Sequence, residues 1–442
     1  MSYKIIMELG WIDFTSDDGE IIKNVINSLE DGDIDLRDAL GVGVIRDRFA
    51  NYFFPGTTTL QSSAKYFFLV PYVFQKLEKK KFKHIREYKN ELKTLEKEQC
   101  NKLLENRETN KNGNYNRTII GSRAIKNKNN ERWINNTPSN IYWGGLKAFG
   151  ILKKDDLSIN EYLTLIMKKW NDEETIKNVI NKKEEGICDD DNADLIDKTS
   201  LWDMLPESIN DSIDGREDME VNNKLSLDLT YEEAYFLKNK IIESKPDSLL
   251  AWMLLNKENV EILNSTEGIK TLSFDDLINE NIYIFLPERL KELCLLAKKF
   301  SDFFYIIEIR YNMIYSEFEN NETVQKWNSV KKDAKKYALT VDIDKIFKAL
   351  ELENTRLKDF LNKCKKIIEN MNEEELDNQN ELKDLDTCII NREKDNKTIS
   401  HAKLSKTVKG AKWIGLDKLT YRINPGKNIV HDILKGLENS NE

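Results

Sequence analysis

Histidine and cysteine are scarce in this chain of 442 residues, which contains three histidines and five cysteines. The histidines (His84, His401 and His431) lie far apart in the sequence. Any one segment therefore offers few of the residues that a zinc-hydrolase site or a Ser-His-Asp triad needs. The cysteines are odd in number and include no Cys-x-x-Cys pair: Cys100, Cys188, Cys294, Cys364 and Cys388. A disulfide framework and a cysteine-based zinc site are therefore not expected. Two of these residues, Cys294 and Cys364, occur in apolar helical patterns and are expected to be buried thiols.

Long apolar runs are also missing. No run approaches the roughly 18 residues that a membrane span requires, and the start, MSYKIIMELGW, has no apolar signal-peptide core. We therefore expect a cytoplasmic protein.

The short Gly41-x-Gly43 pattern is no nucleotide-binding motif and there is no Walker lysine, so no cofactor is expected. A net charge of −9 argues against a protein that coats nucleic acid non-specifically. The content of 40% apolar and 10% aromatic residues is typical of a globular chain.

Residues 37–75 form the most informative segment, RDALGVGVIRDRFANYFFPGTTTLQSSAKYFFLVPYVFQ. Apolar residues recur at helical spacing before and after a Pro55-Gly56 turn. Thr58 or Thr59 is expected to cap the second helix, because a threonine hydroxyl can accept a free amide of the first turn. The favoured interpretation is an αα-hairpin in a core, and the alternative is a helix-turn-helix that reads DNA. In the second case the exposed helix start, Gln61, Ser62 and Lys65, would contact the duplex.

Positive charge is concentrated in two later segments. Residues 107–154 carry ten basic and two acidic side chains, mixed with aromatic residues and a Gly121-Ser122 loop that suits a phosphate backbone. Residues 392–427 carry ten basic and three acidic side chains. The predicted phosphate-binding residues are Arg123, Lys126, Arg132 and Lys412. The competing interpretation is that the aromatic residues are core and the lysines are merely solvated.

Residues 172–233 have the opposite sign, with twenty acidic and six basic side chains. Because apolar residues are few, a linker or surface insertion is expected. Asp189, Asp190 and Asp191 lack the spacing of a calcium-binding loop, so no metal site is predicted there. One hypothesis is that this acidic segment shields the neighbouring basic surface from non-specific DNA.

The remaining chain is predicted to be helical. Residues 76–107 show one apolar seam on a long charged helix, and Thr230 with Glu233 forms a capping-box pattern. Pro287 suits the first turn of a long helix. Two more helices are expected over 323–338 and 342–371, followed by a polar linker over 372–399.

The expected fold is mainly α and multi-lobed, with a helix-turn-helix or winged-helix-like N-terminal part and only small β elements. The expected divisions are 1–154, 155–228, 229–371 and 372–442.

Four blocks of the chain resemble a known bacterial family, the domain of unknown function 6361. They are GWIDF at 10–14, the block at 37–72, PSNIYWGGLKAFGI at 138–151 and LTYRINPGKNIVHDILKGL at 419–437. Lysine-rich loops and the acidic insertion depart from the family pattern. The resemblance implies gene clusters that also carry helicases and phospholipase-D-like nucleases, as in anti-phage defence islands. It supplies no catalytic residues.

Three functions remain open from the sequence. The first is a non-catalytic, DNA-engaging accessory subunit of a bacterial anti-phage defence or DNA-processing complex, with helicase or nuclease partners and double-stranded DNA as ligand. The second is a protein-binding scaffold without DNA contact, in which Trp133, Tyr142 and Trp143 anchor a partner. The third is a metal-dependent nuclease using Asp13, Asp38, Asp47 or the acidic cluster within residues 172–233, since two-metal chemistry needs convergent carboxylates. We expect no enzymatic activity, but the sequence does not decide this.

Overall fold

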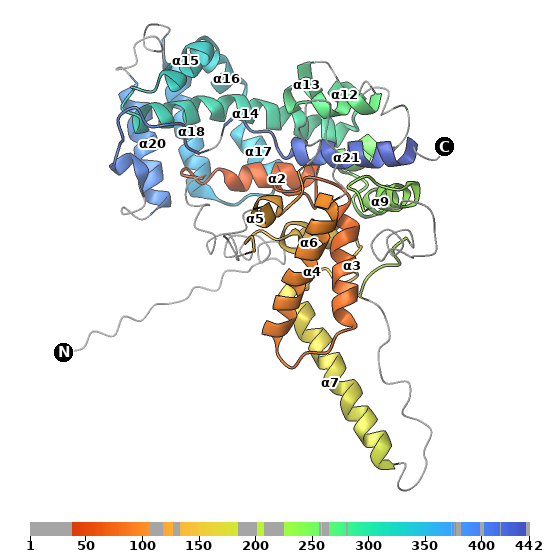
Figure 1. Ribbon diagram of the computed structural model, residues 1–442. Coiled ribbons are helices and arrows are strands. Elements are labelled where there is room, and N and C mark those ends of the chain that lie inside the picture. Colours follow the sequence, from red (N-terminus) through yellow and green to blue (C-terminus); the bar gives the residue numbers. More distant parts are fainter. Residues whose placement is uncertain are drawn as a thin grey trace, which may run out of the picture. The chain divides into compact units, whose positions relative to one another are not determined.

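A computed structural model describes most of the chain and shows a mainly α-helical protein (Figure 1). The described residues are 38–105, 118–126, 133–183, 201–206, 225–255, 258, 265–279, 282–372, 374, 376, 382–397, 402–415 and 417–438. Among them the only β element is an isolated antiparallel bridge between Leu152 and Trp202. The mainly α expectation is confirmed. A winged helix needs a β-hairpin, and the described residues form none.

The chain divides into two compact units, each built from segments that are far apart in the sequence. Unit 1 comprises Met1–Val44 and Lys299–Leu419, and unit 2 comprises Ile45–Lys298 and Thr420–Glu442. Two of the three divisions fall inside helix α2 (Gly43–Phe53) and helix α14 (Glu288–Tyr315), and the third lies between Leu419 and Thr420. The four-part division expected from composition stays a prediction.

Unit 2 contains two groups of packed helices. In the first group, α3 packs against α4 and α6, and α4 also packs against α5 and α7. In the second, α21 packs against α9, α10 and α12. The bounds are α3 Tyr66–Glu78, α4 Ile85–Glu105, α5 Ser122–Lys126, α6 Pro138–Ala148, α7 Ile159–Lys183, α9 Tyr231–Ser244, α10 Leu249–Leu255, α12 Ser265–Thr271, α13 Phe274–Asn279, η2 Ile282–Phe285 and α21 Ile423–Glu438.

Local signals explain where several of these helices begin and end. Thr137 caps α6 by accepting a hydrogen bond from the Asn140 amide, and Gly150 follows the helix at φ +66°. At the start of α9, Thr230 and Glu233 each accept the other's backbone amide, which confirms the predicted capping box. The two residues of the capping box are only three positions apart, so it could be identified from the sequence alone.

An aromatic cluster fills the core beside α3. The Phe74 ring centroid lies 5.0 Å from that of Trp143 and 5.2 Å from that of Tyr162, and Trp202 completes the group. Trp143 and Tyr142 are both buried in α6. They are therefore core residues in this structure, where the scaffold hypothesis had them exposed as partner anchors.

The predicted second helix of the N-terminal hairpin starts later than expected. Helix α3 begins at Tyr66, and its N-cap residue Lys65 makes no side-chain capping bond. Residues 54–65 form turns, because tertiary acceptors take the amides that a helix would use. The Tyr142 hydroxyl accepts the Ser62 and Ser63 amides at 3.0 and 3.1 Å, and Asp432 accepts the Ala64 amide at 2.9 Å. The short turn of a helix-turn-helix is therefore absent between these two described helices.

Two of the three residues expected at an exposed helix start are buried. Lys65 Nζ lies 2.6 and 2.7 Å from the two carboxylate oxygens of Glu233, and both side chains are almost fully buried, at 3% and 0% exposure. Gln61 Nε2 donates to the Gly56 and Ile141 carbonyls. Ser62 is half-buried and its hydroxyl donates to the Thr118 carbonyl. Partners remote in sequence account for the burial of Lys65 and Gln61.

Unit 1 is organised around α18, which packs against α16, α17 and α20. The helix expected over 342–371 is instead two helices, separated by a break in which Glu351 adopts φ 53°. The expected polar linker over 372–399 contains α20, whose buried face includes Leu385 and Ile389. The bounds are α15 Asn321–Val330, η3 Lys331–Asp333, α16 Ala334–Thr340, α17 Ile343–Ala349, α18 Thr355–Asn370, α20 Lys383–Asn396 and η4 Lys403–Ser405.

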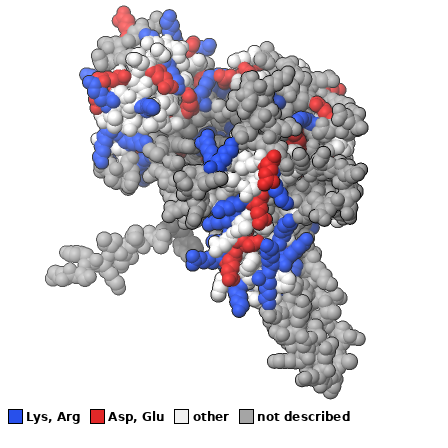
Figure 2. All heavy atoms as spheres, in the orientation of Figure 1, with Lys and Arg blue, Asp and Glu red and all other residues white. Residues whose placement is uncertain are grey.

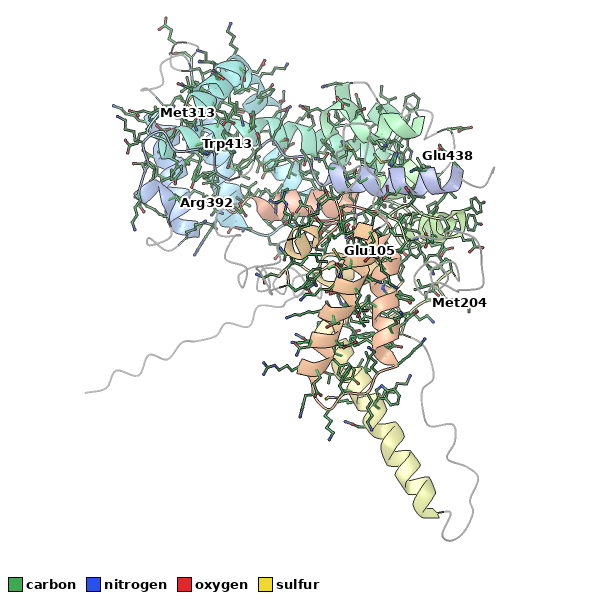
Figure 3. All side chains as sticks on the ribbon, in the orientation of Figure 1. Glu105, Met204, Met313, Arg392, Trp413 and Glu438 are labelled. Atoms are coloured by element: carbon green, nitrogen blue, oxygen red, sulfur yellow. The ribbon has the colours of Figure 1, made fainter. Side chains whose placement is uncertain are left out.

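Buried charges hold α20 in unit 1. The Arg310 guanidinium of α14 donates from Nη2 to Asp386 at 2.7 Å, and the Tyr311 hydroxyl donates to Glu393 at 2.7 Å. Arg392, labelled in Figure 3, donates from Nε to the Leu40 carbonyl at 2.9 Å. These contacts explain why a segment with so many charged residues forms an ordered helix.

The buried Lys65–Glu233 pair predicts a specific pattern of stability changes. Lys65→Met leaves the Glu233 carboxylate buried without its cation, so we expect the free energy of unfolding to fall by about 3–5 kcal/mol. In the double variant Lys65→Met/Glu233→Gln, the glutamine can still accept the Thr230 amide and no buried charge remains. Urea titration should therefore show the double variant to be more stable than Lys65→Met. Equal loss in both variants would contradict this account.

Candidate nucleic-acid interface

Helix α4 buries one face and exposes the rest. Its buried face includes Tyr88, Leu92, Leu95, Gln99 and Leu103, which confirms the predicted apolar seam. The helix extends to Glu105, labelled in Figure 3. Because residues three and four apart share a helix face, the exposed positions can be sorted by sign of charge.

Most exposed charges of α4 separate into a basic and an acidic stripe, while the exposed Lys102 lies on the acidic side. We define the basic stripe as Arg86, Lys89, Lys93 and Lys97, which follow one another at spacings of three or four residues. Eleven residues separate its ends, or about 16 Å along the helix axis. Glu87, Glu91, Glu98 and Glu105 follow another line around the helix. In Figure 2 a row of acidic side chains runs along this region with Lys and Arg side chains beside it.

The cations of the basic stripe are available to a ligand. Arg86, Lys89 and Lys93 are exposed, and none makes an ion pair with another residue in the described part of the chain. The acidic stripe is used locally instead: Glu87 accepts the Lys83 and His84 amides at 3.0 Å, and Glu91 pairs with Lys80. The acidic side chains therefore do not neutralise these three cations.

The turn between α3 and α4 extends the positive charge. Lys79, Lys81 and Lys83 are exposed there, immediately before the helix that carries the basic stripe. Segment 79–97 carries eight basic and three acidic residues, one of which is the buried Glu96. The positive surface therefore continues to the tip of the α3–α4 hairpin.

Helix α5 adds two of the predicted phosphate-binding residues, Arg123 and Lys126, both exposed. It packs against α4, and the preceding Ile120 carbonyl accepts the Cys100 thiol of α4 at 3.2 Å. Gly121 has φ +86°, and a side chain there would meet the Trp133 ring, because an added Cβ would lie 2.3 Å from it. This close contact ties the start of α5 to Trp133.

Trp133 is itself held by α4. Its indole nitrogen donates to Glu96 Oε2 at 3.2 Å, and Lys97 Nζ lies 5.9 Å from its ring centroid. Glu96 Oε1 accepts the Ser139 amide at 2.9 Å. Burial raises the pKa of Glu96, although these hydrogen bonds act in the opposite direction. A buried carboxylate thus connects the basic stripe, Trp133 and the start of α6.

The predicted phosphate-binding residue Lys412 is in the other unit. Lys412 is exposed in unit 1, next to Trp413, whose ring centroid lies 3.9 Å from Lys326 Nζ. Trp413 is labelled in Figure 3. Arg132 lies outside the described residues. The basic stripe was not predicted, although the spacing of basic residues at 86, 89, 93 and 97 is visible in the sequence.

Ser63, Asp432 and His431 come together but do not form a catalytic triad. The Ser63 hydroxyl donates to Asp432 Oδ2 at 2.9 Å, and His431 Nδ1 lies 3.5 Å from Asp432 Oδ1. The carboxylate therefore stands between serine and histidine, whereas a triad needs the histidine in the middle. All three residues are buried, so their role in this structure is to hold the 57–65 segment against α21.

The carboxylates considered for a nuclease have structural partners. Asp38 precedes α2 and accepts the Val42 and Gly43 amides at 2.8 and 2.9 Å. Asp47 pairs with Arg46 and with Arg422. Asp13 lies outside the described residues. Over the ranges that the structure describes, no group of three or more His, Cys, Asp or Glu is arranged to hold a metal ion.

The raised pKa of Glu96 predicts a pH-dependent effect of its replacement. Because the folded state favours the protonated carboxyl, its stabilising contribution is present at acid pH below the ordinary pKa and is lost as pH rises through the folded-state value. Glu96→Gln keeps a neutral side chain at every pH. The stability of this variant relative to wild type should therefore increase from acid to neutral pH, measured by urea titration. A difference independent of pH would contradict the assignment.

No helix among the described residues combines the length and apolar character needed to cross a membrane. Comparison with known proteins found no matching curated protein and no matching solved structure. One family model matches the chain over residues 6–203, a range that includes α4 and α5. The matching model is that of DUF6361, a family of unknown function.

Proposed function

We propose that this protein is a non-catalytic, DNA-engaging accessory subunit of a bacterial anti-phage defence or DNA-processing complex. Its DNA surface would be the basic stripe of α4 with the adjoining lysines at 79–83 and the exposed Arg123 and Lys126 of α5. The observation that carries the proposal is the separation of charge on α4, which leaves Arg86, Lys89 and Lys93 exposed and without an ion pair in the described part of the chain.

Such a surface suits the phosphate backbone of a nucleic acid. Lysine and arginine side chains that neutralise phosphates release condensed counterions, and this release supplies most non-specific affinity. Phosphate contacts position a protein without reading sequence, so sequence-independent binding is expected.

A duplex fits better than a single strand. Single-strand binders stack bases on free aromatic rings, whereas here Trp133 packs on Gly121 and Tyr88 is buried in the α4 seam. The proposed ligand is therefore double-stranded DNA.

The proposed partner proteins are inferred from the family resemblance. Gene clusters that carry helicases and nucleases would supply partners that perform the chemistry, and this chain would contribute affinity for the duplex. Lys412 in unit 1 is a second proposed phosphate contact, since it is exposed in a basic segment.

A protein-binding scaffold is the second candidate, and α9 supplies an observation for it. Tyr231 and Tyr235 are 43% and 54% exposed, and their rings stack with centroids 6.1 Å apart. Exposed tyrosines are common anchors of protein interfaces. The two candidates differ in one observable, which is the affinity of the isolated chain for DNA.

Removing the basic stripe should weaken duplex binding and change its salt dependence. We expect the triple variant Arg86→Ala/Lys89→Ala/Lys93→Ala to lose affinity in fluorescence anisotropy across a salt series. If each side chain neutralises one phosphate, the slope of log K against log salt should become shallower by about 2.7, because each contact contributes about 0.9.

A charge-matched variant controls for the lower net positive charge. Lys332→Ala/Lys336→Ala/Lys348→Ala removes three exposed lysines of unit 1 and changes the net charge equally. It should bind with nearly the wild-type slope. Equal effects of both triple variants would mean that only overall charge matters, and absence of wild-type binding at low salt would leave the scaffold candidate in the lead.

A further inference from the structure

Unit 1 brings two cysteines together that are distant in the sequence. The sulfur of Cys364 in α18 lies 3.7 Å from the sulfur of Cys388 in α20, and the Cys364 thiol donates a hydrogen bond to it. Both side chains are buried, with Cys364 fully enclosed and Cys388 retaining 6% exposure. Since a disulfide bond is about 2.05 Å long, the sulfurs need to approach by only about 1.7 Å.

The two helices are fixed in this arrangement by contacts other than the thiols. Helices α18 and α20 pack directly on each other. Helix α20 is further tied to α14 through the Arg310–Asp386 pair and through Tyr311, which donates to Glu393. The proximity of the two sulfurs is therefore part of the unit 1 core.

We propose that Cys364 and Cys388 are a redox-active pair that forms a reversible intramolecular disulfide on reaction with a hydroperoxide. The Cys388 thiolate attacks hydrogen peroxide, forming an S–O bond as the O–O bond breaks, which gives a sulfenic acid and hydroxide. The Cys364 sulfur then attacks the Cys388 sulfur and displaces hydroxide, and the thiol proton completes a water molecule. Overall, two thiols and one peroxide give one disulfide and two waters.

The environments of the two thiols support these different roles. The hydrogen bond from Cys364, with a smaller contribution from Lys363, lowers the pKa of Cys388 despite its partial burial. Burial raises the pKa of Cys364. The thiolate is the reactive form, so Cys388 is the attacking residue and Cys364 the resolving one. The low exposure of Cys388 favours a small oxidant such as hydrogen peroxide over a bulky one such as oxidised glutathione.

The disulfide would lock α20 onto α18. Helix α20 also carries Arg392, which donates to the Leu40 carbonyl and so holds the segment leading into α2 within unit 1. A cross-link between residues 364 and 388 constrains the unfolded chain and is expected to stabilise the folded state. Oxidation would therefore make unit 1 more resistant to unfolding.

The test is non-reducing peptide mapping of the full-length protein after treatment with hydrogen peroxide. We expect a linked pair of peptides containing Cys364 and Cys388, lost on reduction, and a rise in Tm of the oxidised protein. Buried Cys100 and Cys294 serve as internal controls; burial raises the pKa of Cys294 to about 12, so it should stay reduced. Oxidised glutathione should produce much less cross-link over the same period.

Two variants separate the steps. Cys364→Ser should leave a Cys388 sulfenic acid that a dione probe captures when the peroxide-treated protein is unfolded in its presence, whereas Cys388→Ser should give no captured product at Cys364. Recovery of both residues in alkylated form from peroxide-treated wild-type protein would overturn the proposal, and this result does not depend on whether either variant folds. Equal oxidation of Cys294 would also overturn it, because the pair would then have no special reactivity.

Discussion

The buried ion pair between Lys65 and Glu233 is the interaction on which the rest of unit 2 depends. An unpaired charge in that position would be strongly destabilising, so each residue requires the other to be in place. The pair ties the residue before α3 to the first turn of α9, while Asp432 ties the adjacent Ser63 and Ala64 to α21. The direction in which α3 leaves this cluster then sets the position of the α3–α4 hairpin.

The proposed DNA surface follows from that arrangement. Helix α4 must bury its apolar seam on α3 and α7, which leaves its basic stripe exposed. Glu96 and Trp133 attach the start of α5 beside the stripe, so Arg123 and Lys126 continue a surface that begins at the hairpin tip. Buried polar interactions thus position the exposed cations. This division of roles explains why Lys65, which the sequence placed on the DNA, is a structural residue, whereas Lys89 and Lys93 are candidates for binding.

The sequence predicted the elements that depend on neighbouring residues. The Thr230–Glu233 capping box and the α4 seam each involve residues a few positions apart, so their patterns are visible in the sequence. Two features could not be predicted from the sequence. The late start of α3 depends on hydrogen bonds to Tyr142 and Asp432, which are 79 or more residues away from their donors. Helix α20 depends on buried charge pairs, and its many charged residues are also typical of a linker. The basic stripe could be predicted from the sequence only by assigning each charged residue of α4 to a face of the helix.

The most direct test of the central claim is lysine footprinting of the full-length protein with an amine-acetylating reagent, with and without short duplex DNA, read by mass spectrometry. Bound duplex should protect Lys89, Lys93 and Lys97 from acetylation and leave Lys332, Lys336 and Lys348 as reactive as in the free protein. Protection should disappear at high salt, because phosphate contacts are released there. Unchanged reactivity of Lys89 and Lys93 in the presence of saturating DNA would contradict the account.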